Sequence, residues 1–206
     1  NTIVSNWQNY KLSTFSLLMW LNVFANRSYS DLSQYPVFPW LSSINEEDNF
    51  ELRDFAYPVS VQSDHKRSLA KQKAELNFES TGTANEFNTH YSTSAFTYFY
   101  LFRVSPFTQG MISLQNGRFD NPNRQFHSIF EVLRLLQKYS DNREIVPEVL
   151  YLPELYLNLN YNIFGTRSID NKNVFNEVFL PYYEYNKFER IIMRNLIERS
   201  RNNLHL

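Results

Sequence analysis

One histidine stands where general-base chemistry would be possible. His90 precedes a strongly apolar stretch and is followed closely by the hydroxyl groups of Ser92 and Ser94. A histidine that activates a serine also needs a carboxylate to orient it and a tight turn to present the nucleophile. This segment has neither a glycine for such a turn nor a Gly-x-Ser-x-Gly pattern. We therefore expect Thr89 or Ser92 to cap a helix and His90 to be a hydrogen-bonded structural residue, with a His90-based hydrolase as an alternative.

The remaining histidines do not add a local metal-binding motif. The four are His65, His90, His127 and His205, and no two of them are three or four residues apart. The chain has no cysteine, so thiolate ligands, disulfides and thiol nucleophiles are excluded. We expect neither a metal nor any other cofactor.

Two Pro-Glu pairs supply the most regularly placed carboxylates. Glu148 and Glu154 each follow a proline, and such a pair could in principle do acid–base work of the glycosidase kind. Proline also suits the first position of a helix, where a following carboxylate interacts well with the free N–H groups. The structural interpretation is favoured, and it predicts two short helical pieces between Pro147 and Leu159.

The charge balance argues against binding driven by phosphate groups of a nucleic acid. The chain has 20 Lys+Arg and 21 Asp+Glu, a formal net charge of −1, whereas such binding needs a basic excess. The last predicted helix, residues 186–200, does carry one basic side. It is formed by Arg190, Arg194, Arg199 and Arg201. This side is a weak candidate for a partner or lipid face, and the alternative is a solvated helix surface.

The elements that would position these residues are mostly helical. A helix over 13–26 is apolar on nearly every face, which predicts a central, buried position. Further helices are predicted over 64–79, 92–104 and 120–139. Residues 42–64 are expected to form loop, and 111–114 a short strand or turn. Neither apolar stretch reaches the length that spans a bilayer, and a single domain over 1–206 is expected.

An extended aromatic segment interrupts this helical pattern. In Tyr35-Pro36-Val37-Phe38-Pro39-Trp40, each proline pushes the residue before it out of the α region. The aromatic side chains nevertheless call for burial. We expect a buried, extended segment whose backbone groups are satisfied by partners other than a sheet ladder.

Several charged residues lie beside strongly apolar runs, where an unpaired charge is costly. We expect buried or half-buried Arg–Asp pairs that tie the extended segment to the helices. The predicted polar and aromatic core consists of Arg27, Asp31, Tyr35, Trp40, His90, Arg103, Asp120 and Arg124.

The segment from Asn22 to Trp40 resembles the hallmark of the BEACH (Beige and Chédiak–Higashi, neurobeachin-like) domain family, most closely over Arg27 to Trp40. Other parts of the chain resemble the family in the same order. They are Leu52–Val59, Thr89–Ser92, Arg103–Thr108, Leu114–Arg124, Glu144–Glu154 and Val174–Pro181. The resemblance covers essentially the whole chain, and the final part of the domain is expected to be missing or diverged.

The resemblance implies a mainly α single domain, with helices around partly extended core segments that are not part of a ladder. It implies no catalytic activity, and instead a scaffold role in a larger protein of membrane trafficking or of lysosome, autophagy or vesicle regulation. Implied partners are other proteins, including an adjacent pleckstrin-homology-like module and WD40 repeats. The implied location is cytoplasmic and peripheral to membranes. An architectural subunit of a large stable assembly is the alternative.

Overall fold

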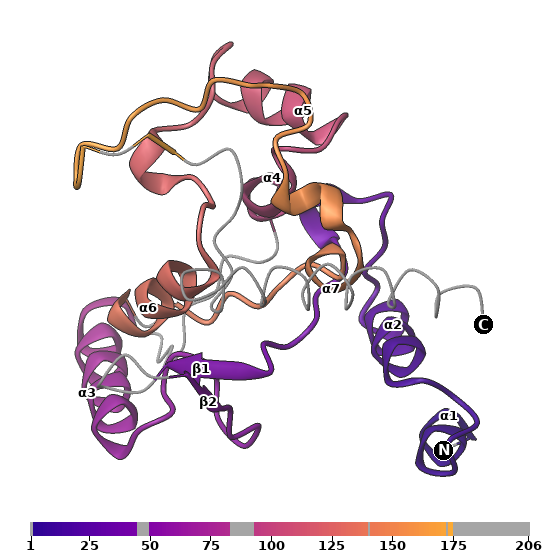
Figure 1. The fold of residues 1–206 in the computed structure, drawn as a ribbon. Helices are drawn as coiled ribbons and strands as arrows, with labels where there is room; N and C mark the ends of the chain where they lie inside the picture. The colour runs from indigo at the N-terminus through magenta and orange to yellow at the C-terminus, as the bar shows by residue number, and fades with distance from the viewer. Residues whose placement is uncertain (1, 45–49, 83–92, 140, 172, 175–206) are drawn as a thin grey trace.

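The structure, a computed structural model, describes residues 2–44, 50–82, 93–139, 141–171 and 173–174, and this part of the chain is mainly helical (Figure 1). The α-helices in it are α1 (Thr2–Gln8), α2 (Thr14–Phe24), α3 (Asp64–Thr81), α4 (Ser94–Leu101), α5 (Phe107–Leu114), α6 (Ile129–Tyr139) and α7 (Glu148–Tyr151). Short 3-10 turns cover Leu32–Gln34, Pro122–Arg124 and Pro153–Tyr156. Strands β1 (Ser42–Ile44) and β2 (Phe50–Leu52) pair antiparallel, with Ser43 opposite Glu51. The predicted mainly α fold is confirmed.

The extended segment 35–40, which we call the central ribbon, runs through the core. Tyr35, Phe38 and Trp40 are all buried, and Phe38 is only 1% exposed. The ribbon forms one isolated bridge rather than a ladder. Its two hydrogen bonds join Phe38 N to Ile145 O (2.8 Å) and Ile145 N to Phe38 O (3.0 Å). The predicted extended core segment outside a sheet is therefore confirmed.

Side chains take the place of a neighbouring strand along the central ribbon. Val37 N donates to Asn22 Oδ1 (2.7 Å), and Asn22 Nδ2 donates to Val37 O (2.9 Å). Arg27 Nη1 donates to Tyr35 O (2.9 Å), and Trp40 N donates to Glu144 Oε2 (2.7 Å). Backbone groups that would be costly to bury unpaired are thus satisfied at several points.

Helix α4 packs beside the ribbon and carries much of the aromatic core. Tyr100, fully buried, donates from its hydroxyl to Glu144 O (3.1 Å) and meets Phe96 and Phe126 edge-to-face. Thr97 Oγ1 donates to Leu32 O (3.1 Å), which joins α4 to the 3-10 turn that precedes the ribbon. These contacts make α4 and the ribbon one packed unit.

Helix α2 begins as predicted but is not central. Ser13 caps the helix, because its Oγ accepts a hydrogen bond from Ser16 N. Within α2, however, only Leu17 and Asn22 are buried. Trp20, Leu21, Val23 and Phe24 are exposed, and Phe24 is 67% exposed. In Figure 1, α1 and α2 lie at one edge of the described structure. The prediction failed because an apolar composition does not say which tertiary neighbours exist to cover each face.

Three local predictions also differ from the structure. Residues 111–114 are the end of helix α5, and the expected loop 42–64 contains the β1–β2 hairpin. The helix expected over 120–139 is split, because Asn121 caps a 3-10 turn that begins at Pro122 and the chain is extended at Gln125. This extension places Phe126 in the core before α6 begins. The predicted helix over 186–200 lies outside the described residues.

Candidate functional site

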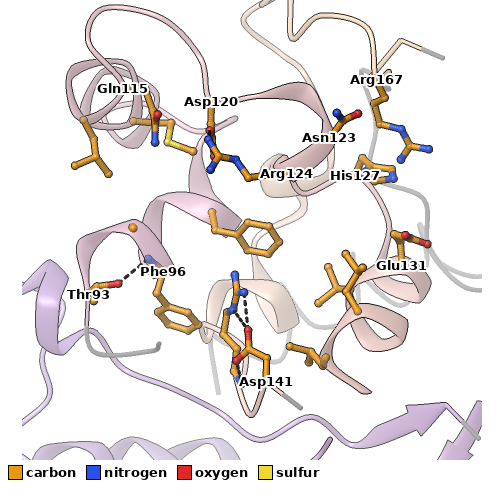
Figure 2. A pocket seen from close by; sticks show the side chains of 18 of the residues that line it. Thr93, Phe96, Gln115, Asp120, Asn123, Arg124, His127, Glu131, Asp141 and Arg167 are labelled. Atoms are coloured by element: carbon orange, nitrogen blue, oxygen red, sulfur yellow. Dashed lines mark hydrogen bonds and ion pairs between the residues drawn. The ribbon is translucent and has the colours of Figure 1, made fainter. Parts of the chain in front are cut away.

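A pocket of about 630 Å³ opens between helices α4, α5 and α6 (Figure 2). Its size is within the range of small-molecule and side-chain binding cavities. Most of its lining surface is apolar, although polar residues make up about half of the lining residues. The apolar lining residues are Ala95, Phe96, Phe99, Met111, Leu114, Val132, Leu135, Leu136 and Ile169.

The local sequence explains how these elements present the lining. Thr93 caps α4 by accepting from Phe96 N (3.4 Å), and this fixes the start of the helix at the edge of the pocket. On α6, Val132 and Leu136 are one turn apart and buried, so one apolar stripe faces the core. Packed helices therefore hold one part of the cavity, and the connecting segments that contain Asp120, His127 and Asp141 form the rest.

The polar lining of the pocket is electrically balanced. Three arginines (124, 143 and 167) are matched by the carboxylates of Asp120, Glu131 and Asp141. Asp120 pairs with Arg124 (2.6 Å), Asp141 with Arg143 (2.6 Å) and Glu131 with Arg134 (2.9 Å). Arg167 pairs with Asp170. The site therefore offers hydrogen-bonding groups and apolar surface rather than a strong net field.

Among the described residues, His127 is the one histidine in this lining. Its side chain is 8% exposed, and Nδ1 lies 2.9 Å from the carbonyl oxygen of Gln125. Burial lowers the pKa of His127; the Gln125 carbonyl and Glu131 oppose that effect, and the charges of Arg167 and Arg103 add to it. The neutral imidazole is favoured.

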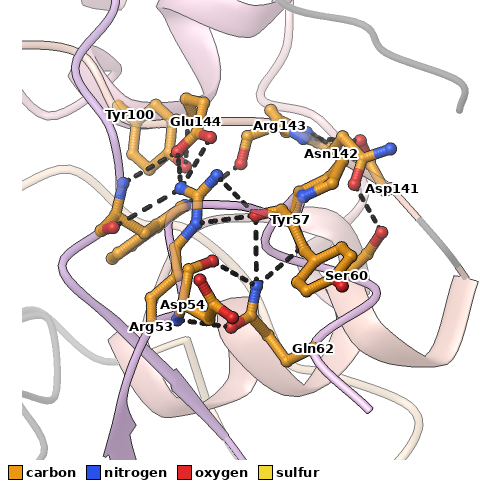
Figure 3. Close-up of polar contacts among 12 residues, drawn as sticks. Arg53, Asp54, Tyr57, Ser60, Gln62, Tyr100, Asp141, Asn142, Arg143 and Glu144 are labelled. Carbon is orange, nitrogen blue, oxygen red and sulfur yellow. Dashed lines mark hydrogen bonds and ion pairs between the residues drawn. The ribbon is translucent and has the colours of Figure 1, made fainter. Parts of the chain in front are cut away.

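A half-buried ion pair fixes the segment that forms one wall of the pocket (Figure 3). Arg53 Nη1 lies 2.8 Å from Glu144 Oε1 and 3.0 Å from Oε2, and it also reaches Trp40 O at 3.4 Å. Burial raises the pKa of Glu144, and the Trp40 N–H and Arg53 oppose that effect. We call Arg53 and Glu144 the clamp, because together they hold the end of the central ribbon against residues 141–144.

A buried carboxylate, that of Glu148, joins the ribbon to α7. Tyr35 Oη donates to Glu148 Oε1 (2.7 Å), and burial raises the pKa of Glu148, with the Tyr35 hydrogen bond opposing. Burial and Glu148 raise the pKa of Tyr35 in turn. The predicted first-turn position of Glu148 is found, but the contact with Tyr35 gives it a tertiary role. Tyr29 and Tyr151 complete the cluster, with their hydroxyls 3.5 Å apart.

Some predicted core residues lie where expected. Tyr35, Trp40 and Arg103 are buried, and Arg27 is half-buried. Arg103 donates from Nη1 to Phe126 O (2.5 Å) and lies over the ring of Phe164 (4.9 Å). Burial lowers its pKa to about 9.

The pairing expected among these residues needs correction. Asp31 is exposed, and its carboxylate caps the 3-10 turn by accepting from Ser33 N (2.8 Å) and Gln34 N (3.2 Å). Asp120 does pair, with Arg124, but Arg124 is exposed, so this pair belongs to the pocket rim and not to the core. His90 and the four arginines of the last predicted helix lie outside the described residues.

Sequence reasoning missed the residues that hold the site. Arg53 and Glu144 are 91 positions apart, and the segments that contain them, Leu52–Val59 and Glu144–Glu154, do not mark the two residues as partners. Asn22 sits within a helical apolar run, where a lone buried amide is a weak signal for a backbone partner. His127 follows Phe126 without any spacing that suggests a site. Each of these roles depends on residues that only the tertiary fold brings near.

The described residues contain no group of three or more His, Cys, Asp or Glu side chains that could hold a metal ion. Within the same residues, no helix is long and apolar enough to cross a membrane.

Comparison with known proteins gives consistent matches. The family model described as the Beige/BEACH domain matches residues 5–206. A putative neurobeachin homolog of Caenorhabditis elegans is 35% identical over 201 residues, which cover 94% of this chain and 8% of that protein. BEACH domain-containing protein lvsD of Dictyostelium discoideum is 35% identical over 203 residues, which cover 93% of this chain and 7% of that protein.

Proposed function

The chain belongs to the Beige/BEACH domain family, and from this membership we propose that it acts as a non-enzymatic protein-interaction domain of a larger protein. The observation that carries the proposal is the pocket between α4, α5 and α6. Its apolar floor and balanced polar rim suit an inserted segment of a partner protein. The rim carboxylates already pair with arginines, which suits a rigid, preorganised surface.

The larger protein is a separate part of the proposal. This chain spans only 7–8% of the length of the curated relatives that it matches. We propose that neighbouring modules, a pleckstrin-homology-like module and WD40 repeats, accompany it. The proposed setting is membrane trafficking or the regulation of lysosomes, autophagy or vesicles, in the cytoplasm and peripheral to membranes. The family resemblance is the support for this setting.

A matched pair of substitutions tests whether the pocket binds partner proteins. Leu114 lines the pocket and is 46% exposed, whereas Leu150 does not line it and is 45% exposed. Both lie in helices, so Leu114→Glu and Leu150→Glu place the same charge on comparable surfaces. Proximity labelling with the full-length protein should lose a set of neighbours in Leu114→Glu and keep it in Leu150→Glu.

The same comparison can refute the proposal. If both variants keep their thermal unfolding midpoints and label the same proteins as the unchanged chain, the pocket is not the interaction site. A Leu114→Glu variant that unfolds would be replaced by Ile169→Glu. Ile163→Glu is its control, because both isoleucines are exposed and only Ile169 lines the pocket.

The exposed face of α2 favours a second candidate function, that of an architectural subunit of a stable assembly. Trp20 and Phe24 stack on one another at 6.0 Å between ring centroids and are both exposed. Permanent interfaces are more apolar than transient ones. Native mass measurement of the full-length protein from cells would favour this role if it shows a complex of fixed stoichiometry that Phe24→Glu disrupts.

A further inference from the structure

We propose that Nε2 of His127 accepts a hydrogen bond from a neutral donor, a hydroxyl or an amide N–H, on a partner segment that occupies the pocket. This inference rests on the proposed function and deepens it, because it names the chemistry that the pocket selects. It assigns a specificity-determining role to a side chain that is otherwise nine-tenths buried.

The tautomer of His127 follows from its neighbour. Nδ1 of His127 lies 2.9 Å from Gln125 O. Because a carbonyl oxygen only accepts hydrogen bonds, Nδ1 must carry the hydrogen of the neutral ring. In the neutral ring, Nε2 then has a free lone pair. Gln125 is itself held in place, because its Nε2 donates to Asp120 O (2.7 Å) and Phe164 O (3.1 Å).

The ring is available for a ligand at this nitrogen. His127 is in the pocket lining, and Nε2 has no hydrogen-bond partner among the described residues. A polar atom of a nearly buried side chain is normally satisfied by protein or water. An acceptor that lines a cavity and lacks a protein partner is therefore a point where a bound segment can gain a directional contact.

The charges around His127 favour a neutral donor over a cation. Arg167, from the segment after Phe164, and Arg103, which follows α4, both act on the ring with positive charge. Glu131 on α6 opposes them but already pairs with Arg134. Arg167 is itself paired with Asp170, yet its charge and that of Arg103 still disfavour a positive charge at the ring, so a hydroxyl or amide suits Nε2 better than an ammonium group.

The other lining residues indicate which further side chains the bound segment should have. Its three lining arginines each pair with a carboxylate, so they offer little to a phosphate or a strongly acidic peptide. The floor, formed by residues such as Phe96, Phe99 and Leu136, favours an apolar side chain. Charge complementarity therefore points to an uncharged peptide segment with an apolar side chain near a Ser, Thr, Tyr, Asn or Gln.

The test uses a random twelve-residue peptide library panned against the full chain, followed by affinity measurement with the enriched peptides. His127→Asn keeps an amide N–H that can reach the Gln125 carbonyl, but has no atom at the position of Nε2. We expect the peptide to bind about ten- to a hundredfold more weakly to this variant, because its buried donor loses its acceptor. Replacing the donor residue of the peptide by Ala should weaken binding to the unchanged chain and have little further effect on His127→Asn.

A measurement that needs no variant protein guards against misfolding. Protonation of His127 at acid pH converts Nε2 from acceptor to donor, so peptide affinity for the unchanged chain should fall as the pH falls. The Ala-substituted peptide, which lacks the donor, should not show that fall. Equal pH profiles for the two peptides would overturn the inference.

The remaining outcomes separate this inference from the proposed function. If Leu114→Glu abolishes peptide binding but His127→Asn does not weaken it, the inference fails and the protein-binding pocket stands. If no enriched peptide is sensitive to Leu114→Glu, both fail. If sedimentation shows a dimer of the chain that Leu114→Glu dissociates, a second copy occupies the pocket and the peptide proposal is wrong.

Discussion

The central ribbon and helix α2 are both rich in large apolar side chains, yet the fold treats them in opposite ways. Phe38 of the ribbon is almost completely buried, while Phe24 of α2 is mostly exposed. The ribbon lacks the internal hydrogen bonds of a helix, so burying it is the harder task. It is buried nevertheless, because Asn22, Arg27 and Glu144 satisfy its backbone.

The comparison shows that burial here follows from available partners rather than from hydrophobicity alone. Helix α2 satisfies most of its own backbone hydrogen bonds, so nothing forces its outer face inward. Its inner face packs against the core through Phe15, Leu18 and Met19, and its buried residues are Leu17 and Asn22. Asn22 is polar, and it is the residue that reaches the ribbon.

The largest difference between the two regions should appear when a phenylalanine is removed from each. We expect Phe38→Ala to lower the free energy of unfolding by about 4 kcal/mol, because it opens a cavity in the packed core. Phe24→Ala should change it by less than about 0.5 kcal/mol, as at most surface positions. Urea unfolding followed by circular dichroism measures both. Equal losses of unfolding free energy in Phe38→Ala and Phe24→Ala would mean that the outer face of α2 is covered.

The next largest effect should come from breaking the clamp. Arg53→Met leaves the half-buried carboxylate of Glu144 without its cation, and we expect a loss of about 3 kcal/mol in unfolding free energy. The matched control, Arg134→Met, breaks the more exposed pair with Glu131 and should cost about 0.5 kcal/mol. A clamp variant as stable as the control would show that the ribbon does not depend on this ion pair.

A smaller effect is expected at the contact that joins the two regions. Asn22→Leu removes the partner of both Val37 N and Val37 O and should cost about 2 kcal/mol, since unsatisfied buried groups are expensive. Val23→Leu, at the neighbouring exposed position, is the control and should have little effect. Thermal denaturation of the two variants measures both changes in stability. If Asn22→Leu leaves the stability unchanged, water can replace the amide as the partner of Val37.

The smallest effect should be a pH dependence at the ribbon's contact with α7. The folded-state pKa of Glu148 is raised by burial, so its contribution to stability is fully present below the unfolded pKa and is lost as the pH rises through the folded pKa. Glu148→Gln keeps an oxygen that can accept from Tyr35 but does not titrate. The stability of the unchanged chain relative to Glu148→Gln should therefore fall between acid and neutral pH. A constant difference would contradict the buried, ionisable role of Glu148.

Much of the fold could be predicted because it is encoded locally. The N-cap at Ser13, the two short pieces at Glu148–Tyr151 and Pro153–Tyr156, and the extended shape of the ribbon all follow from caps and prolines. The break between the 3-10 turn at Pro122 and helix α6 was missed, because the amphipathic pattern continues across it. Gln125 is extended there and bonds Phe164 O, a contact across 39 positions.

The candidate site was less predictable than the fold. Asp120 and Arg124 were singled out, and they do pair, but as part of the pocket rim. His127 gave no signal, because its significance depends on the Gln125 carbonyl and on a cavity made by three helices. The sequence indicates which polar residues are costly to bury. It does not indicate which distant residue will supply the hydrogen bond or opposite charge that each of them needs.

The sequence by itself determined the family, the helical class and the extended course of Tyr35 to Trp40, because motifs, caps and prolines act over a few neighbouring residues. The tertiary structure alone decided that Glu144 and Asn22 serve the ribbon, that the face of α2 stays exposed, and that His127 lines a pocket. The physical reason is range: local conformation depends on adjacent residues, whereas burial and pairing depend on residues that meet only when the chain has folded.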